Sequence, residues 1–361
     1  MIKKQHIVVG LSGGVDSAVS AYLLKKQGHK VTGIYMQNWE TDNDDPYCTA
    51  QQDLADAASV CETLSIDFHV VNFAKEYWNN VFQYCLDEFA ASRTPNPDIW
   101  CNKEIKFKVF LEHAQHLGAD LLATGHYAKI IENNGFYEMH KAADANKEQT
   151  YFLYTLGQEQ LKHACFPLAD LPKDQVRKIA QEAGLENANK KDSTGICFIG
   201  ERRFKQFLKE FIIGKPGDIL TEKGVTVGQH DGLMYYTLGQ RKGINIGGIK
   251  DAKEAAWYVI DKDVPKNQLI IGQSHDHPRL QSTSLVCNDA HWTGMAPTLP
   301  LHCKAKTRYR QADQTCTLHA HDNGNILVTF EQAQRAITPG QAIVFYQGTQ
   351  CLGGATIASR G

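Results

Sequence analysis

A glycine- and serine-rich run near the start of the chain has the residue types needed to bind phosphate. The segment His6–Val9 is predicted to be a β-strand and a helical pattern begins at Asp16, so the run Gly10-Leu-Ser-Gly-Gly-Val-Asp-Ser17 joins a strand to a helix. Glycine lets the backbone turn tightly and brings N–H groups close to an anion, and the helix adds its positive N-terminal end. The run lacks both the lysine of a Walker A loop and the G-x-G-x-x-G of a dinucleotide fingerprint. It predicts a different phosphate cradle, and the alternative is an ordinary turn with Asp16 or Ser17 as N-cap.

Cys101 is the first of two cysteines whose surroundings favour a reactive thiol. It follows the proline-stiffened segment Thr94–Trp100, and the helix is expected to resume at about Asn102. A helix N-terminus and the neighbouring Lys103 should stabilise a thiolate, which is the form that a nucleophile needs. Burial as a small apolar side chain is the alternative.

Cys197 is the second of these cysteines. It lies in Lys190-Lys-Asp-Ser-Thr-Gly-Ile-Cys-Phe-Ile-Gly200, where lysines and glycines predict a flexible, electropositive loop. Such a loop suits a thiol that accepts a sulfur atom and presents it. Burial is again the alternative. No two of the ten cysteines are spaced C-x-x-C, which argues against a zinc ribbon, and without an export signal they predict a reducing, cytoplasmic compartment.

The elements that must position these groups alternate between strand and helix in the first half of the chain. Further strands are predicted at Lys30–Met36, Asp67–Phe73 and Asp120–Thr124, with helices between them. Repeated strand–helix units predict a parallel sheet with helices on both faces, and such sheets bind ligands at the carboxyl ends of their strands.

Three residues are expected at that edge of the sheet. Met36 ends the second strand, where an adenine would lie. Gly125 would let the backbone approach the nucleotide, and His126 could form a hydrogen bond with a base. A core methionine and an ordinary loop histidine are the alternatives.

The second half of the chain is predicted to be β-rich. Short alternating runs follow about Lys209, and the stronger alternation from about Leu280 to Arg360 predicts a small β-barrel. A hairpin is predicted earlier, at Ile130–His140. In the predicted strand Leu301–Arg310, four cations would share one side and could follow a phosphate backbone, or form an ordinary solvated face: Lys304, Lys306, Arg308 and Arg310.

The composition is that of a soluble globular protein. Hydrophobic residues make up 42% and charged residues 22% of the 361 residues, and charges interrupt every apolar run, so we expect neither a disordered chain nor a membrane protein. The length predicts two or three domains. The net charge is −2, but residues 1–200 are acidic and the remainder is mildly basic. That asymmetry fits a polyanion against the back half, or an uneven solvated surface.

Six motifs, in this order, give the chain a specific resemblance to one family. They are Gly10-Leu-Ser-Gly-Gly-Val-Asp-Ser17, Asn96-Pro-Asp98 with Cys101-Asn102, Thr124-Gly-His-Tyr127, Lys191-Asp-Ser-Thr-Gly-Ile-Cys-Phe-Ile-Gly-Glu201, Tyr236-Thr-Leu-Gly-Gln-Arg-Lys-Gly243 and Lys306-Thr-Arg-Tyr-Arg310. The first resembles the pyrophosphate loop of the ATP-pyrophosphatase superfamily. Together they resemble the bacterial-type tRNA-specific 2-thiouridylases, essentially from end to end.

The resemblance implies a fold of the α/β plus β class. Residues 1–205 would form a parallel-sheet ATP-pyrophosphatase (PP-loop) domain of the adenine nucleotide alpha-hydrolase type. Residues 206–280 would form a small central β-rich domain, and residues 281–361 a C-terminal β-barrel. The two smaller domains would contact tRNA.

The resemblance also implies an activity. The family forms 2-thiouridine at the wobble position (34) of tRNAs for Lys, Glu and Gln by adenylating uracil O2, with release of AMP and pyrophosphate. Cys197 takes the place of the cysteine that carries a persulfide, and Cys101 matches the nucleophile that frees the sulfur through a transient disulfide with Cys197. A cysteine desulfurase or sulfur-relay protein would supply the persulfide sulfur.

Other site residues follow from the same resemblance. Mg²⁺ would accompany ATP, with Asp16 as a candidate ligand, and no zinc is expected. The residues matching ATP-binding positions are Gly10, Leu11, Ser12, Gly13, Gly14, Val15, Asp16, Ser17, Met36 and Gly125. Those matching target-base contacts are Asn96, Pro97 and Asp98, and those matching contacts with the tRNA anticodon arm are His126, Lys147, Glu148, Gln149, Arg308, Tyr309 and Gln341. In one departure, Lys147-Glu-Gln149 stands where the family usually has Lys-Asp-Gln, which gives position 148 a longer reach.

Three other functions remain open from the residues alone. Another ATP-pyrophosphatase synthetase, adenylating a small carbonyl or carboxylate substrate, would need no cysteine pair. A noncatalytic RNA-binding module would bind RNA without releasing AMP. A thiolase with a cysteine-bound iron–sulfur cluster would contain iron, which the lack of C-x-x-C disfavours.

Overall fold

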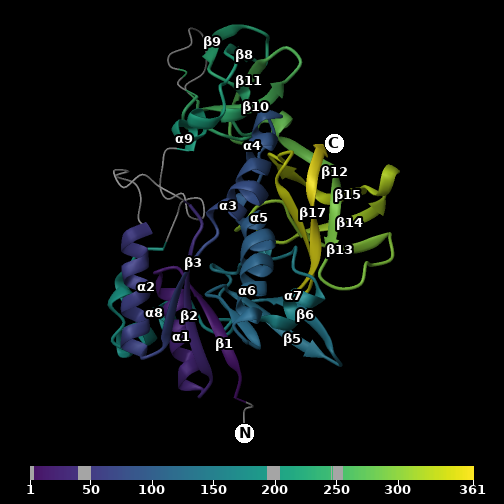
Figure 1. The fold of residues 1–361 in the computed structure, drawn as a ribbon. Coiled ribbons are helices and arrows are strands. Elements are labelled where there is room, and N and C mark those ends of the chain that lie inside the picture. The colour runs from purple at the N-terminus through teal and green to yellow at the C-terminus, as the bar shows by residue number, and fades with distance from the viewer. Residues whose placement is uncertain (1–3, 40–49, 193–203, 245, 247–254) are drawn as a thin grey trace.

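Three β-sheets organise the part of the chain that the computed structural model describes, which comprises residues 4–39, 50–192, 204–244, 246 and 255–361 (Figure 1). The N-terminal sheet has the order β3-β2-β1-β4-β7, and each pair of neighbours is parallel. Its strands are β1 (His6–Leu11), β2 (Lys30–Gln37), β3 (Asp67–Asn72), β4 (Leu121–Ala123) and β7 (Ala164–Cys165). Because the strand order reverses between β1 and β4, their carboxyl ends form the switch point at which such sheets bind ligands.

Helices cover both faces of this sheet because its strands are apolar on both sides. Ile7, Val9 and Leu11 of β1 enter one apolar cluster, whereas Val8 enters the opposite one. The first cluster is covered by α1 (Val15–Lys26), α2 (Ala50–Leu64) and α8 (Lys173–Glu182). The second is covered by α3 (Ala74–Tyr77), α5 (Pro97–Trp100) and α6 (Phe110–His116), together with π-helical turns at Trp78–Phe82 and Cys101–Val109. Helix α4 (Gln83–Ala90) buries Cys85 and Phe89 in the apolar cluster of the central domain.

A hairpin connects this domain to the C-terminal barrel. Strands β5 (Ala128–Asn133) and β6 (Phe136–Lys141) are joined at Asn134-Gly135, where both residues have positive φ, as a tight hairpin turn requires. Strand β6 then pairs with β17 (Gln350–Arg360) of the barrel. The predicted hairpin is thus present, and it extends the barrel sheet into the N-terminal domain. Helix α7 (Gln158–His163) follows it in the chain.

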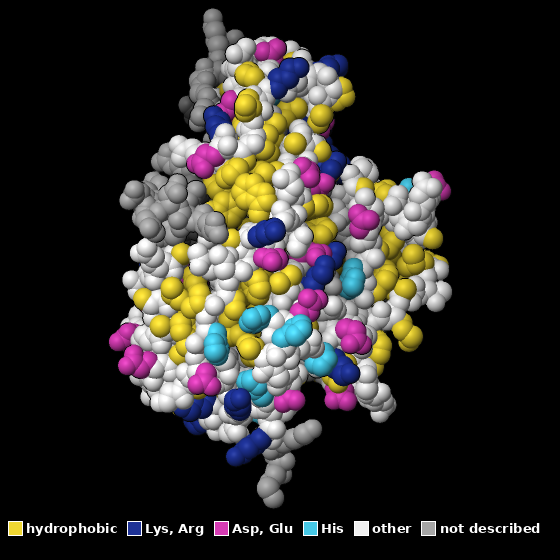
Figure 2. Space-filling model, in the orientation of Figure 1, with side chains coloured by type: hydrophobic (Ala, Val, Ile, Leu, Met, Phe, Trp, Pro, Cys, Tyr) yellow, Lys and Arg dark blue, Asp and Glu magenta, His cyan; other side chains and the backbone are white. Residues whose placement is uncertain are grey.

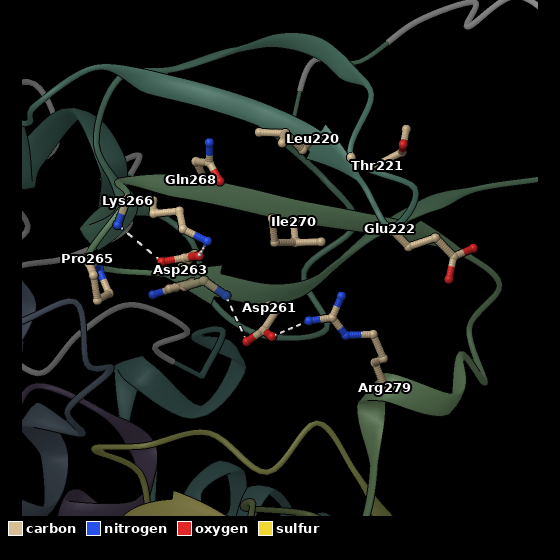
Figure 3. A pocket seen from close by; sticks show the side chains of 12 residues that line it. Leu220, Thr221, Glu222, Asp261, Asp263, Pro265, Lys266, Gln268, Ile270 and Arg279 are labelled. Atoms are coloured by element: carbon tan, nitrogen blue, oxygen red, sulfur yellow. Dashed lines mark hydrogen bonds and ion pairs between the residues drawn. The ribbon is translucent and has the colours of Figure 1, made fainter.

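The central domain begins with α9 (Phe204–Phe211) and forms a sheet of order β10-β11-β8-β9. Its strands are β8 (Gly217–Thr221), β9 (Thr226–His230), β10 (Trp257–Asp263) and β11 (Gln268–Gln273). A shallow pocket of about 480 Å³ opens on this sheet (Figure 3). Charged side chains of its lining already have partners, because Lys266 pairs with Asp263 at 3.1 Å and Asp261 pairs with Arg279 and with Arg360 of the barrel.

Aromatic packing connects the central domain to the N-terminal one. The Trp39 ring, just beyond β2, lies 5.0 Å from that of Phe82 and 5.9 Å from that of Phe207 in α9. Figure 2 shows hydrophobic side chains gathered at the surface below the central domain. Trp78, the first residue of a π-helical turn, is 38% exposed, and its ring lies 5.7 Å from that of Trp39.

The C-terminal strands close into an antiparallel barrel. Their order is β12-β15-β14-β13-β16-β17, and β12 pairs back onto β17. The strands are β12 (Gln281–Trp292), β13 (Leu301–Lys306), β14 (Gln314–Ala320), β15 (Ile326–Arg335), β16 (Ala342–Gln347) and β17. Short 3₁₀ turns lie at Thr150–Phe152, Glu186–Asn189, Leu233–Tyr235, Pro278–Leu280 and Asp322–Gly324. The predicted fold class, a parallel-sheet domain followed by a small β-rich domain and a β-barrel, is therefore confirmed.

The predicted strand over residues 301–310 is wrong in its second half. Strand β13 ends at Lys306, and the chain then turns, with the Thr307 N–H donating to Gln311 Oε1 at 2.8 Å and Arg310 in the left-handed region. Lys306 is mostly buried and forms an ion pair, and Arg308 is half-buried. The four cations therefore do not form a continuous exposed stripe.

Candidate functional site

The Gly10–Ser17 run lies at the switch point of the N-terminal sheet, between β1 and α1. Gly14 is the N-cap of α1, and the first helical hydrogen bond runs from the Ala18 N–H to the Gly14 carbonyl at 3.3 Å. The first N–H groups of a helix lack intrahelical partners and point toward any anion at that end. Ser17 Oγ accepts from the Ser12 N–H at 3.2 Å and donates to the Gly14 carbonyl at 3.0 Å. The loop is thus held in shape by its own serine, and neither Asp16 nor Ser17 is the N-cap.

Glycine is required at two places where other backbone approaches this loop. Gly13 has φ +73°, and a Cβ there would lie 2.5 Å from the Asp53 carbonyl oxygen. A Cβ on Gly125, at the end of β4, would lie 2.7 Å from the Ser17 backbone nitrogen. Gly125 thus permits a close approach to the loop itself, and its approach to a nucleotide stays a prediction.

Asp16 is the loop's carboxylate, and the tertiary fold surrounds it with partners that the sequence does not reveal. Lys173 Nζ lies 2.7 Å from each of its oxygens, and the Tyr127 hydroxyl donates to it at 2.8 Å. Lys173 also pairs with Asp192 at 2.8 Å. Burial raises the pKa of Asp192, but hydrogen bonds from Lys147 and Lys173 outweigh it and bring that pKa to about 2. No short-range spacing could have found Lys173, because it lies 157 positions from Asp16.

Residues 186–192 lie over the loop. The Asn187 side-chain amide donates to the Gly13 carbonyl at 3.0 Å, and Arg177 donates to the Ala188 carbonyl at 3.0 Å. Lys190 forms ion pairs with Asp53 and Asp56. Two carboxylates from α2 thus neutralise the charge of Lys190, whereas the electropositive character of the loop around Cys197 stays a prediction. Cys197 lies outside the described residues.

Thr124–Tyr127 continue from β4 along the same edge. His126 forms a 2.7 Å hydrogen bond with Thr124 Oγ1, and its ring packs near those of Phe107 and Phe166. Burial, with a smaller contribution from the Lys106 charge, lowers the pKa of His126 well below its usual range, so the ring is neutral at pH 7. A neutral ring can accept or donate one hydrogen bond, as base recognition needs. Met36 is buried in the core cluster on one face of the sheet.

Cys101 lies deeper in its helix than the sequence suggested. The helix begins at Pro97, with Asn96 as N-cap accepting from the Asp98 and Ile99 N–H groups at 3.1 and 3.4 Å. The predicted resumption at about Asn102 is therefore wrong, although an N-cap asparagine before proline is a known start signal that could have located it. Cys101 is 0% exposed and begins a π-helical turn.

Segment 147–152 links the loop region to the Cys101 helix. The Asn102 amide donates to the Phe152 carbonyl at 3.0 Å, and Gln149 Oε1 accepts from the Tyr127 N–H at 2.9 Å. Lys147 pairs with Asp192. Glu148 points inward: it is 4% exposed and pairs with Lys306 at 3.1 Å. A contact between Glu148 and tRNA thus stays a prediction that requires a different conformation of this carboxylate.

The remaining predicted tRNA contacts also have partners within the protein. Arg308 donates to the carbonyls of Ala336 and Leu238 at 2.9 and 3.3 Å. The Tyr309 ring lies 4.5 Å from that of Phe152. Gln341 donates to the Thr94 carbonyl at 2.8 Å. The structure thus brings together two sets of predicted residues. The first is the loop with Gly125–Tyr127, 147–149 and Tyr309, whose hydroxyl donates to the Lys147 carbonyl at 3.5 Å. The second is the helix start at 96–101 with Gln341, which contacts the two residues before it.

Within residues 4–39, 50–192, 204–244, 246 and 255–361, no cluster of three or more His, Cys, Asp or Glu side chains could hold a metal ion. Across that part of the chain, no helix has the length and apolar character to cross a membrane.

Comparison with family models divides the chain into three matches. Residues 5–201 match a tRNA methyl transferase HUP domain, residues 205–273 a tRNA methyl transferase PRC-barrel domain, and residues 282–357 an aminomethyltransferase beta-barrel domain.

Curated relatives match along almost the whole chain. The tRNA-specific 2-thiouridylase MnmA of Coxiella burnetii (strain RSA 493) is 57% identical over 356 residues, which is 98% of each chain. The protein of the same name from Salmonella arizonae is 56% identical over 358 residues, covering 99% of this chain and 97% of that protein. The descriptions of two of the family models refer to methyl transfer, whereas the names of the relatives refer to thiolation. Identity of 56–57% along almost the whole of both chains shows that this chain belongs to the family of these relatives.

Solved structures match more weakly. A 4-thiouridine synthetase in complex with RNA and bound ATP has a TM-score of 0.35 and 16% identity, covering 57% of this chain and 50% of that one. An NMN synthetase from Francisella tularensis has a TM-score of 0.34 and 18% identity, covering 54% of this chain and 68% of that one.

Proposed function

The chain belongs to the tRNA-specific 2-thiouridylase family, and from this premise we propose that it replaces O2 of the wobble uridine with sulfur in tRNAs for Lys, Glu and Gln. The observation that carries the proposal is the 57% identity over 98% of the chain to a relative of that name. The preformed loop at the sheet's switch point supplies the kind of site that such a reaction needs.

The C2 carbonyl of uracil is a poor electrophile, so the reaction must first activate it. Uracil O2 attacks the α-phosphorus of ATP, which forms an O–P bond, breaks the bond to the β-phosphate bridge and releases pyrophosphate. The terminal sulfur of a Cys197 persulfide then attacks C2, and AMP leaves with the former O2. The Cys101 thiolate attacks the sulfur of Cys197, which forms a Cys101–Cys197 disulfide and releases the 2-thiouridine. A dithiol reductant must then supply two electrons to restore both thiols.

The loop residues would bind the triphosphate of ATP. The α1 N-terminus and the tight turn at Gly13 favour phosphate at Gly10–Ser17, with Gly125 packed against Ser17. Met36, at the end of β2, would contact the adenine. Asp16 would hold Mg²⁺ once the ammonium of Lys173, which now pairs with it, is displaced, because magnesium is usually bound by one or two carboxylates plus phosphate oxygens. Magnesium would neutralise phosphate charge there.

The target uridine would enter between the two sets of residues described above. Asn96, Pro97 and Asp98 begin the helix that carries Cys101, so a base held there would lie near its sulfur. Neutral His126 would recognise a base edge, since single-stranded RNA is recognised through splayed bases. Tyr309 and segment 147–149 would contact the anticodon arm. The sulfur would reach Cys197 from a cysteine desulfurase or a sulfur-relay protein.

The test is thiolation of unmodified tRNA in vitro. Purified protein is incubated with transcribed tRNA, ATP and a persulfide donor, and digested nucleosides are analysed by mass spectrometry alongside AMP. We expect 2-thiouridine and AMP in equal amounts, no thiolation by Cys101→Ser or Cys197→Ser, and near-normal thiolation by Cys303→Ala, which removes a buried barrel thiol. Release of AMP with a small carbonyl substrate and without tRNA would instead favour another synthetase of the superfamily.

A further inference from the structure

The fold supplies a lysine that the phosphate loop lacks in its sequence. Walker A loops hold phosphate with a lysine of their own, and Gly10–Ser17 has none. In the structure the Nζ of Lys173 lies 2.7 Å from both carboxylate oxygens of Asp16, which belongs to the first turn of α1. A cation is therefore present at the site where phosphate would bind.

The position of Lys173 is fixed along its whole length. It is the first residue of α8, and its backbone N–H donates to Asp144 at 2.9 Å. Its side chain is only 10% exposed and lies over the face of Tyr127, 6.0 Å from the ring centroid. A side chain that is already ordered loses little conformational entropy when it takes up a new ligand nearby.

The two carboxylates that pair with the Lys173 ammonium also have other partners. Two carboxylates, Asp16 and Asp192, face three cations that pair with them. The cations are Lys147, Lys173 and Arg177. If Lys173 turns away from Asp192, that carboxylate keeps Lys147 and Arg177, and Asp16 keeps the hydroxyl of Tyr127. Each of the two carboxylates thus keeps an ion-pair or hydrogen-bond partner when the Lys173 ammonium leaves.

We propose that Lys173 is a phosphate-binding residue, whose ammonium exchanges Asp16 for the β- and γ-phosphate oxygens of ATP and stays with the pyrophosphate as it leaves. The proposal rests on the proposed function. When uracil O2 attacks the α-phosphorus, the electron pair of the broken P–O bond goes to the pyrophosphate oxygen, and a fixed cation there stabilises the developing charge. The step needs no further reactant.

The competing role is structural, with Lys173 serving to hold α8 against α1 through Asp16. The two roles differ in which ligands they affect. A phosphate ligand contributes to binding of ATP and pyrophosphate but not of AMP, whereas a structural defect would weaken all three. Calorimetric titration with ATP, inorganic pyrophosphate and AMP distinguishes them without any tRNA.

We expect Lys173→Met to weaken pyrophosphate and ATP binding by about tenfold or more, the usual size for a charge-assisted hydrogen bond, while AMP affinity changes less than threefold. Lys173→Arg should recover part of the loss. Lys178→Met, which removes an exposed lysine of the same helix that pairs only with Glu182 at 3.8 Å among described contacts, should match the wild type. Equal weakening of all three ligands, or of none, would overturn the proposal.

A double variant separates the roles if Lys173→Met folds poorly. Asp16→Asn with Lys173→Met removes the ion pair as a unit, so a merely structural lysine would then be dispensable and binding would match Asp16→Asn alone. We expect the double variant to bind pyrophosphate at least fivefold more weakly than Asp16→Asn. Absence of ATP and pyrophosphate binding by the wild type itself would instead contradict the proposed function.

Discussion

Gln341 of the barrel donates its side-chain amide to the carbonyl oxygen of Thr94 at 2.8 Å, with a second contact of 3.3 Å to the carbonyl of Pro95. The Thr94 N–H donates in turn to the Pro339 carbonyl at 3.0 Å, and its hydroxyl lies 3.4 Å from that of Thr237 in the central domain. All three domains thus meet at the residues that directly precede Asn96–Asp98, the proposed target-base segment. Gln341 therefore supports that segment through hydrogen bonds within the protein, independently of any contact with tRNA.

Gln341→Ala should therefore loosen residues 92–98 even without tRNA. Loss of the two hydrogen bonds, worth about 1–2 kcal/mol together, should speed amide hydrogen exchange in this segment and lower the thiolation rate by about 5- to 30-fold. The KM for ATP should stay near normal, since the nucleotide loop is not touched. Gln347→Ala, at an exposed end of β16, is the control. Unchanged exchange at 92–98 would show that Gln341 acts on tRNA alone.

Gly125→Ala should disable nucleotide binding. Its Cβ would lie 2.7 Å from the Ser17 nitrogen and 2.8 Å from the Asp16 carbonyl carbon, both of them backbone atoms, so the loop must shift. We expect ATP affinity to fall at least tenfold, measured by calorimetric titration. Gly157→Ala provides the comparison, because its nearest contact would be an ordinary 3.4 Å to a side-chain atom. Normal ATP binding by Gly125→Ala would mean that this contact does not shape the site.

Lys306→Met should destabilise the joint between the barrel and the N-terminal domain. Lys306 neutralises Glu148, which is 4% exposed, and its removal leaves a buried carboxylate without its cation. The expected loss is about 3–5 kcal/mol in the free energy of unfolding, measured by urea denaturation. Lys304→Met, on the same strand but exposed, should cost little. Adding Glu148→Gln to Lys306→Met should restore much of the stability, and failure to do so would place the defect elsewhere.

Lys262 should make stability depend on pH above neutrality. Burial lowers its pKa to about 8, while its ammonium donates to the Ser92 carbonyl at 3.0 Å. Between pH 8 and the ordinary lysine pKa the unfolded chain binds the proton and the folded one does not, so unfolding becomes harder as pH rises. The unfolding free energy of the wild type minus that of Lys262→Met should increase by about 2 kcal/mol from pH 7.5 to 10. A constant or falling difference would contradict a depressed pKa.

Local patterns were sufficient for the architecture. The alternation of Ile7, Val8 and Val9 places them in opposite clusters, as a strand buried on both faces requires. Asn134-Gly135 specifies a hairpin turn through positive φ. The Gly10–Ser17 run is recognisable because its glycines and serines adjoin one another and need only a strand before and a helix after. Each of these features depends on neighbours within a few residues.

Errors arose where tertiary contacts decided a boundary or a partner. Strand β13 stops at Lys306 because Gln311 and the half-buried Arg308 form a turn that packs against the central domain, and no glycine or proline marks it. Lys190 appears as a free cation in the sequence, yet it contacts Asp53 and Asp56 of α2. Ion pairs between residues far apart have no spacing that a sequence pattern can reveal.

The sequence by itself determined the family, the strand–loop–helix phosphate cradle and the order of the parallel-sheet and barrel domains, because these depend on contiguous motifs and on short-range periodicity. Only the tertiary structure decided that Lys173 reaches Asp16, that Gln341 braces Thr94 and that Glu148 faces Lys306. These contacts form only when the chain packs, because a polar group that packing buries needs a partner, and here each partner lies more than a hundred residues away.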